Sequence, residues 1–281
     1  MSEKIVELFG HPATIDSTLD WAKTVAEQHC PYLERTCLKV RKSQSEIAIG
    51  TCTVGHGHLN IIICPYRLLE RRQVFTDCLH LLTLHEPGNE LHIVGEIAIP
   101  GGSVDYFVVS AKKRKVTDFV GIEFQTLDTT GTVWPARQRF LASAHVKVRK
   151  KDVKSSKPFG MNWKMTAKTI LVQMHHKIQT FEHFNKHLVL VVQDCLLEYM
   201  RREFSFSHLS NPPRLGDPMQ IHSYGLDLQN SNFRLQLKER LSTDTAGVAM
   251  CLGLHASPKV EYAMIVKQLE SKLSEKTLIT L

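Results

Sequence analysis

The chain has 281 residues, which is enough for one large domain, or for one domain with a small appendage. A hydrophobic content of 43% with 22% charged residues is typical of a folded globular protein and excludes a disordered one. No apolar run reaches the roughly 18 residues that a membrane span requires, and the first residues lack the apolar segment of a signal peptide. We therefore expect neither a membrane protein nor a secreted one.

Positive charge is concentrated in one stretch of the chain. Lysine and arginine total 35 against 28 acidic residues, a net charge of +7, and residues 137 to 168 hold ten of those basic residues with a single acid, Asp152. Such a basic stretch on an otherwise near-neutral protein is typical of a polyanion binder. A solvated surface face is the alternative interpretation.

The first third of the chain alternates between helical and irregular patterns. Apolar residues at helical spacing predict a helix within residues 1 to 29. Residues 30 to 66 contain four of the seven cysteines and short alternating stretches. Residues 67 to 86 return to an apolar stripe at helical spacing, so we expect a second helix there.

Three strands, a helix and a further strand are predicted next. The strands cover residues 92 to 99, 104 to 110 and 119 to 127, with a tight turn at Pro100-Gly101-Gly102. A long amphipathic helix covers residues 162 to 184. The run HLVLVV at 187 to 192 is continuous and apolar, as in a strand that is buried on both faces of a sheet.

This order of elements predicts an α/β fold rather than an all-β fold or a helical bundle. Residues 204 to 257 show a mixture of short strands and loops that the pattern does not assign. Residues 259 to 275 have the spacing of a final helix.

Acidic side chains occur on the second and third predicted strands. Asp105 starts the second strand, and Glu123 and Gln125 lie two residues apart on the third. Alternate residues of a strand share a face, so Glu123 and Gln125 point one way while Ile122 and Phe124 point into the core. If the two strands are neighbours, Asp105 and Glu123 converge, and two carboxylates at a sheet edge suit Mg²⁺.

Glu96 is a second-tier candidate for the same site. If Gly101-Gly102 is a two-residue hairpin loop, residue 98 pairs with residue 105, residue 96 pairs with residue 107, and Glu96 shares the face of Asp105. For any one of these acids, an exposed, solvated carboxylate is the alternative. The apolar character of the strands and the basic stretch that follows them favour a site that meets phosphate.

Four cysteines lie within 35 residues of the chain, at spacings of x6, x14 and x11; they are Cys30, Cys37, Cys52 and Cys64. Four thiolates suit a tetrahedral zinc or iron ion. The spacing lacks the close CxxC pairs of ribbon-type zinc sites. His56 or His58 replacing one thiol, and buried cysteines without a metal, are therefore open alternatives.

The stretches SVDYFVVS and DFVGIEFQTLDTTGT resemble the nuclease core of the PD-(D/E)xK superfamily, and most of all the NotI-type restriction endonucleases, which use Asp and Glu-x-Gln. The resemblance covers roughly residues 28 to 193. It implies that Asp105 and Glu123 hold Mg²⁺ and that Gln125 positions the attacking water. It also implies a structural iron or zinc on the four cysteines, placed ahead of the nuclease core as in that family.

The resemblance implies a fold and a division of the chain. The expected fold is α/β with a restriction-endonuclease-like core, a mixed sheet flanked by helices, and a small N-terminal four-cysteine subdomain. Residues 1 to 66 would form the N-terminal helix and metal-binding subdomain, and residues 67 to 281 the nuclease core with DNA-recognition loops and a C-terminal helix.

The function implied is that of a type II restriction endonuclease, a Mg²⁺-dependent deoxyribonuclease of the bacterial cytoplasm. It would cut double-stranded DNA at a short GC-rich palindrome, such as one containing GGCC, as a homodimer, with a cognate DNA methyltransferase as a genetic partner only. Arg137 and Arg139 are the predicted base readers. The predicted phosphate contacts are Lys147, Arg149, Lys150 and Lys151.

Two other functions use the same features. A metal-stabilised DNA-binding protein without catalysis would share the basic stretch and the cysteines, but it has no reason to bring acids to a phosphate. A nuclease of low sequence specificity would share the chemistry entirely, and residue types alone do not separate it from a restriction enzyme.

Overall fold

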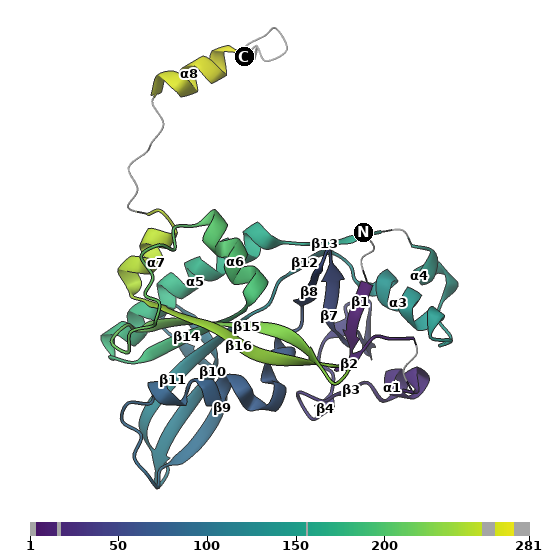
Figure 1. The fold of residues 1–281 in the computed structure, drawn as a ribbon, viewed down its shortest axis with the longest axis horizontal. Coiled ribbons are helices and arrows are strands. Elements are labelled where there is room, and N and C mark those ends of the chain that lie inside the picture. The colour runs from purple at the N-terminus through teal and green to yellow at the C-terminus, as the bar shows by residue number, and fades with distance from the viewer. Residues whose placement is uncertain (1–3, 16–17, 156, 255–261, 273–281) are drawn as a thin grey trace.

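The computed structural model describes residues 4–15, 18–155, 157–254 and 262–272 of the chain (Figure 1). Within these residues a six-stranded sheet in the order β16-β15-β14-β11-β10-β9 forms the centre, and a four-stranded sheet in the order β2-β1-β7-β8 lies at one end of it. Helices flank the central sheet. The protein therefore has the expected mixed α/β fold around a mixed sheet.

The central strands are β9 (Glu90–Ile99), β10 (Gly102–Lys112), β11 (Lys115–Gln125), β14 (His187–Gln193), β15 (Met219–Gln229) and β16 (Asn232–Thr243). The strands of the smaller sheet are β1 (Lys4–Leu8), β2 (His11–Pro12), β7 (Thr51–His56) and β8 (Leu59–Ile62). Three two-stranded pairs complete the strands of the described residues: β3 (His29–Cys30) with β4 (Arg35–Thr36), β5 (Val40–Arg41) with β6 (Gln44–Ala48), and β12 (Thr129–Gly131) with β13 (Phe159–Met161).

The α-helices are α1 (Trp21–Glu27), α2 (Gln73–Asp77), α3 (Trp134–Ser143), α4 (Lys150–Lys154), α5 (Trp163–His183), α6 (Asp194–Glu203), α7 (Thr245–Cys251) and α8 (Tyr262–Glu270). Two 3₁₀ helices, η1 (Pro65–Arg72) and η2 (Leu79–Leu81), flank α2. None of the helices in the described ranges is long and apolar enough to cross a membrane.

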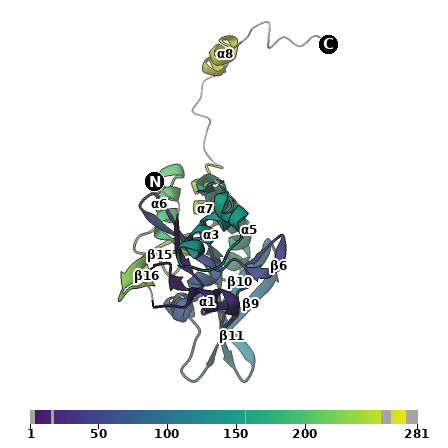
Figure 2. The same cartoon turned by 90° about the vertical axis from the view of Figure 1, so that its right-hand side faces the viewer.

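Strand direction in the central sheet follows from the connections. Tight turns join β9 to β10 and β10 to β11, so these three strands are antiparallel. Helix α5 carries the chain from β11 back to the start of β14, and β11, β14 and β15 are therefore parallel. The ends of β9, β10 and β11 that are far from the small sheet project beyond the helices (Figure 2).

Each face of the sheet is covered by a different helical layer. Strand β14 is buried at every residue, as its continuous apolar sequence predicts. Leu188 and Leu190 belong to the core on the α5 side, and Val189 and Val191 belong to the core under η1 and α2. Gly121 of β11 is needed on the α5 side, because a Cβ there would lie 2.4 Å from the Phe181 ring.

Two predicted helices take a different form. Residues 4 to 8 pair with β7 as strand β1, and the helical pattern of residues 1 to 29 is realised only in the short α1. The helix expected over residues 67 to 86 is broken, because Glu70 is extended and Arg71 and Arg72 are left-handed, with φ of 50° and 56°. Contacts of Glu70 with the distant strand β16 outweigh the local helical periodicity there.

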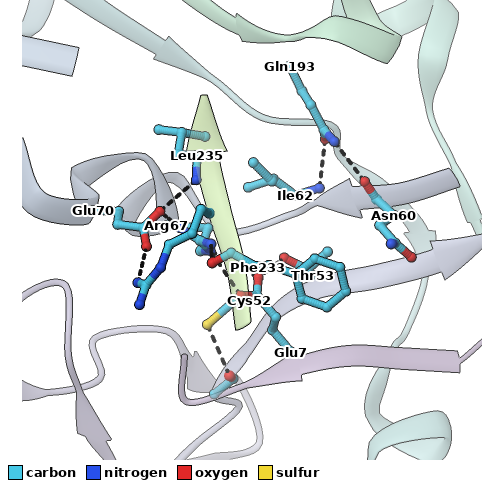
Figure 3. A network of polar contacts seen from close by, with 12 residues as sticks. Glu7, Cys52, Thr53, Asn60, Ile62, Arg67, Glu70, Gln193, Phe233 and Leu235 are labelled. Carbon is cyan, nitrogen blue, oxygen red and sulfur yellow. Dashed lines mark hydrogen bonds and ion pairs between the residues drawn. The ribbon is translucent and has the colours of Figure 1, made fainter. Parts of the chain in front are cut away.

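A buried polar network joins the small sheet to the central sheet (Figure 3). Arg67 Nε donates to Glu7 Oε2 of β1 at 2.9 Å, and its Nη2 donates to the Phe233 carbonyl of β16 at 2.9 Å. Gln193, at the end of β14, accepts from Ile62 N and donates to the Asn60 carbonyl, both in β8. These hydrogen bonds between buried groups tie the two sheets to each other.

The C-terminal part contains the longest hairpin of the central sheet. The described part of the unassigned segment, residues 204 to 254, contains β15, β16 and α7, and α7 packs on α5. Residues 255–257 of that segment lie outside the described residues. The predicted final helix is present as α8, although residues 259–261 and 273–275 of that prediction lie outside the described residues.

Candidate active site

Asp105 and Glu123 lie opposite each other on neighbouring strands. Tyr106 pairs with Ile122 in the β10–β11 register, so the preceding residue of β10 faces the following residue of β11. The Phe124 amide donates to Asp105 Oδ2 at 2.8 Å, which ties the carboxylate to β11. The structure therefore brings together the two acids that the sequence pattern paired.

The alternation of β11 determines which way Glu123 points. Ile122 and Phe124 enter the core under η1 and α2, so Glu123 faces helix α5 together with Gly121. Its side chain is almost completely buried between the sheet and that helix.

Lys177 of α5 is the functional candidate that the sequence pattern missed. Its Nζ lies 2.6 Å from Glu123 Oε1, and the two side chains are only 8% and 6% exposed. The one available signal was its place in the stripe of α5 that also contains Met174, Ile178 and Phe181, where a lysine interrupts an otherwise apolar face. A charge on a buried stripe needs a partner of opposite sign, but the stripe alone does not say which one.

Burial dominates the electrostatics of the two acids. It raises the pKa of Glu123 to about 7, with the Asp105 charge acting in the same direction and Lys177 opposing both. Burial likewise raises the pKa of Asp105 above its usual value, partly offset by the Phe124 amide and by Lys177. Carboxylates whose charged form is disfavoured in this way are typical of functional sites and of sites that receive a cation.

Glu96 lies in a different register from the one that the hairpin pattern predicts. The turn between β9 and β10 is Pro100-Gly101 instead of Gly101-Gly102, because Gly102 already pairs with Ile99. Glu96 therefore lies opposite Asp105, between the pairs Val104–Ile97 and Tyr106–Gly95. Its backbone is left-handed, with φ of 47°, and its side chain is exposed at the rim of the site.

Gln125 follows Glu123 on the same face at the end of β11. Its side chain is half-buried, and Nε2 donates to the Thr126 carbonyl at 2.6 Å. Among the described residues, no hydrogen bond to Gln125 Oε1 is seen. This oxygen can therefore accept a hydrogen bond from a water.

The oxygen donors fit a divalent cation that shares its coordination with a substrate. Asp105 and Glu123 supply two neighbouring carboxylates, and Mg²⁺ is usually held by one or two carboxylates together with water and phosphate oxygens. No group of three or more His, Cys, Asp or Glu side chains in the described ranges is arranged to hold a metal ion.

The four predicted cysteine ligands are all buried, and all are reduced. Burial raises the pKa of the Cys64 thiol to about 11, and the nearby thiols of Cys30 and Cys37 add to the rise. Burial also places the pKa of Cys52 well above its usual value, with the neighbouring Cys64 next in effect. The donors match a tetrahedral metal in type and lie in one region, but the described residues do not assemble three of them into a metal geometry.

The predicted DNA-contacting residues divide into two groups. Arg137 is 2% exposed: its Nε donates to the Ile49 carbonyl at 2.6 Å, and its guanidinium stacks on Trp134 at 4.8 Å. Because Arg137 lies inside the fold, it does not reach a DNA base. Burial also lowers the pKa of its guanidinium to about 10. The exposed residues are Arg139, Lys147, Arg149, Lys150 and Lys151. Arg139 Nη1 donates to the Ser155 carbonyl.

Comparison with known proteins gives one family. Residues 19–214 match the family model described as Restriction endonuclease NotI, which covers the candidate active site, the four cysteines and the basic stretch. No curated protein matches the chain.

Proposed function

The chain belongs to the NotI restriction endonuclease family, and on that premise we propose that it is a type II restriction endonuclease. It hydrolyses phosphodiester bonds of double-stranded DNA at a short GC-rich palindrome, for which GGCC-containing sites are the first to test. The observation that carries this proposal is the pair of carboxylates on adjacent strands, the half-buried Asp105 and the buried Glu123. A protein that only binds DNA gains nothing from acids at a phosphate.

The active centre is proposed to be a PD-(D/E)xK site in the Glu-x-Gln form. Asp105 and Glu123 would hold Mg²⁺, which when bound supplies a water of lowered pKa and a positive charge against the phosphate. Gln125 accepts from the attacking water and orients it toward phosphorus, and its neutral amide takes no proton. Glu96, at the rim, accepts from waters that enter the site.

The N-terminal part is proposed to be stabilised by iron or zinc. Cys30, Cys37, Cys52 and Cys64 would be its ligands, with thiolates that the metal keeps deprotonated despite their burial. Residues 1 to 66 would form this metal-binding subdomain, and residues 67 to 281 the nuclease core.

Recognition is proposed to involve a homodimer, since a palindrome presents each strand of the duplex with the same sequence. Lys147, Arg149, Lys150 and Lys151, all exposed, would contact phosphates, and Arg139 is the remaining base reader of the predicted pair. We also propose that the protein acts in the bacterial cytoplasm and that a cognate DNA methyltransferase is its genetic partner.

Digestion of a GC-rich plasmid with purified protein, with Mg²⁺ and with EDTA, tests the proposal directly. Discrete Mg²⁺-dependent fragments whose sequenced ends share one palindrome are expected. A smear of fragments would instead indicate a nuclease of low sequence specificity. Intact plasmid that is nevertheless retarded on a gel would indicate a DNA-binding protein without catalysis.

A further inference from the structure

Lys177 is the one lysine that is buried in the part of the chain the structure describes, and it contacts a carboxylate of the candidate active site. Removing a lysine ammonium from water costs several kcal/mol, and an ion pair with one carboxylate recovers this only in part. A well-packed apolar residue at this position of α5 would serve the fold as well. The pair therefore points to a use beyond stability.

The turn between β9 and β10 is shaped to fit around this lysine. A Cβ on Gly101 would lie 2.8 Å from the His176 carbonyl oxygen, and a Cβ on Gly102 would lie 3.2 Å from Lys177 Cε. Thr180 Oγ1 donates to the Pro100 carbonyl at 3.2 Å and holds the turn on α5. The turn that precedes Asp105 thus packs against the stem of Lys177 and fixes where its ammonium ends.

The ammonium has unused hydrogen-bonding capacity. It carries three N–H donors, and among the described residues Glu123 Oε1 is the one acceptor within hydrogen-bonding distance of Nζ. Two donors thus remain for groups other than the described residues, and the lysine charge also acts on Asp105.

The charges of the site show which group those donors suit. Two ionised carboxylates and one ammonium leave a net charge of −1, a divalent cation would change it to +1, and one phosphodiester would bring it to zero. The strand motif itself has no cation, because position 125 is glutamine. Lys177 is thus the positive charge of the site, delivered from the helix instead of the strand.

We propose that Lys177 is a catalytic residue whose ammonium binds a non-bridging oxygen of the scissile phosphate. In the free protein it donates to Glu123. In the complex with DNA it retains that bond and turns its free donors to the phosphate, whose negative charge grows on the equatorial oxygens as the water attacks. The attacking water forms a bond to phosphorus as the bond between phosphorus and the leaving oxygen breaks. The proton lost by the water passes to bulk solvent, the leaving oxygen takes a proton from solvent, and no proton needs to leave the ammonium. This inference rests on the proposed function.

The chain offers a matched control in Lys186. Its Nζ lies 2.5 Å from Asp118 Oδ1, so it forms a second lysine–carboxylate pair, between the segment that follows α5 and the same strand β11. Asp118 is 1% exposed and Lys186 is 16% exposed. Asp118 also accepts from the Leu84 amide, far from Asp105, so this pair is structural.

The experiment compares Lys177→Met, Lys177→Arg and Lys186→Met with the wild type in single-turnover cleavage and in thermal unfolding. We expect Lys177→Met to lower the cleavage rate constant at least about 100-fold with DNA affinity changed by a few-fold, and Lys177→Arg to recover part of the rate. Lys186→Met should lower the melting temperature and leave the rate constant of the folded protein unchanged. If Lys177→Met does not fold, Lys177→Gln replaces it with the same expectation.

A second measurement separates contact with phosphate from support of Glu123. DNA with a neutral methylphosphonate at the scissile position, located from the sequenced fragment ends, is bound in EDTA by wild type and by Lys177→Met. The penalty of the methylphosphonate relative to phosphate should be at least about threefold larger for the wild type. Equal penalties, or cleavage by Lys177→Met within fivefold of the wild type, would overturn the inference alone. A wild type that cuts no DNA would overturn the proposed function together with it.

Discussion

Gly101 lies so close to His176 that no side chain fits between them. A Cβ at position 101 would come within 2.8 Å of the His176 carbonyl oxygen, and the φ of Gly101 is +93°. The β9–β10 turn and the middle of α5 are therefore in direct backbone contact. The position of the candidate active site relative to the helix depends on this contact.

Replacing Gly101 with alanine should lower the free energy of unfolding by about 2 to 4 kcal/mol, because it adds a clash with backbone to a strained φ. Urea denaturation measures this change. Gly88→Ala is the control, since Gly88 has φ of +89° and nothing within 4 Å of its Cβ position. The difference in unfolding free energy between the two variants measures the cost of the clash. Equal losses of unfolding free energy would show that α5 moves to accommodate the alanine.

Removing either carboxylate should abolish cutting and preserve binding. For Asp105→Asn and Glu123→Gln we expect the cleavage rate to fall by about three orders of magnitude, since each removes a proposed ligand of the cation. Gel retardation in EDTA should show unchanged or tighter DNA binding. Asp227→Asn, at an exposed carboxylate paired with Lys238, is the acidic control. Near-normal cutting by either active-site variant would refute the assignment.

The cysteines should differ in their effect on bound metal. Cys52→Ser should eliminate iron and zinc from the purified protein, because a tetrahedral site needs all four thiolates. Cys78→Ser should keep the full metal content, although Cys78 is as buried as Cys52 and contacts His222. Elemental analysis per chain is the measurement. Wild-type protein without iron or zinc would end the proposal of a structural metal.

Stability should fall in acid because of His222. Burial lowers the pKa of this residue from 6.5 to about 3. As the pH falls, His222 is therefore protonated near pH 6.5 in the unfolded chain but only near pH 3 in the folded protein. The stability that is complete above pH 6.5 is thus lost as the pH falls. At pH 4.5 the loss is about 3 kcal/mol.

Urea denaturation of wild type and His222→Gln at pH 7.5 and 4.5 isolates this effect from other titrations. Glutamine keeps a neutral side chain that can bond to Gln220, as His222 does. The variant should lose less stability than the wild type between the two pH values. Equal losses would mean that His222 is protonated inside the fold.

The basic stretch should separate into surface and core contributions. Replacing Lys150 and Lys151 with glutamine should weaken DNA binding and reduce the slope of log K against log salt by about 1.8, the value for two phosphate contacts. Arg137→Met should instead lower the free energy of unfolding and leave the slope unchanged, because its guanidinium is bonded to the Ile49 carbonyl inside the fold. Titrations at several salt concentrations distinguish the two outcomes.

Sequence periodicity predicted those elements whose local pattern and burial agree. Strand β14 and helix α5 were predicted nearly to the residue, and the alternation around Glu123 correctly assigned its face. Sequence periodicity gave the wrong element where contact with a residue far along the chain determines the local backbone conformation. Glu70 leaves the helical path to meet Arg234 and the Leu235 amide, more than 160 residues away.

The same limit explains the missed member of the candidate site. Lys177 lies 54 residues from Glu123, and only the packing of α5 on β11 reveals that they meet. Arg137 is the converse case. Its residue type suits DNA, but its guanidinium is bonded inside the fold to the carbonyl of Ile49, which lies 88 residues away and is not revealed by local sequence.

The Arg67 network has a consequence for anyone exchanging parts between relatives of this protein. Arg67 lies three residues after Cys64, the last of the four proposed metal ligands. Its carboxylate partner Glu7 nevertheless comes from the first strand, and its carbonyl partner Phe233 from the last strand of the central sheet. A chimera joined near residue 66 would inherit the arginine from one parent and Glu7 from the other. Successful grafts must therefore transfer Glu7, Arg67 and the β16 backbone around Phe233 as one unit, even though these pieces are separated by most of the gene.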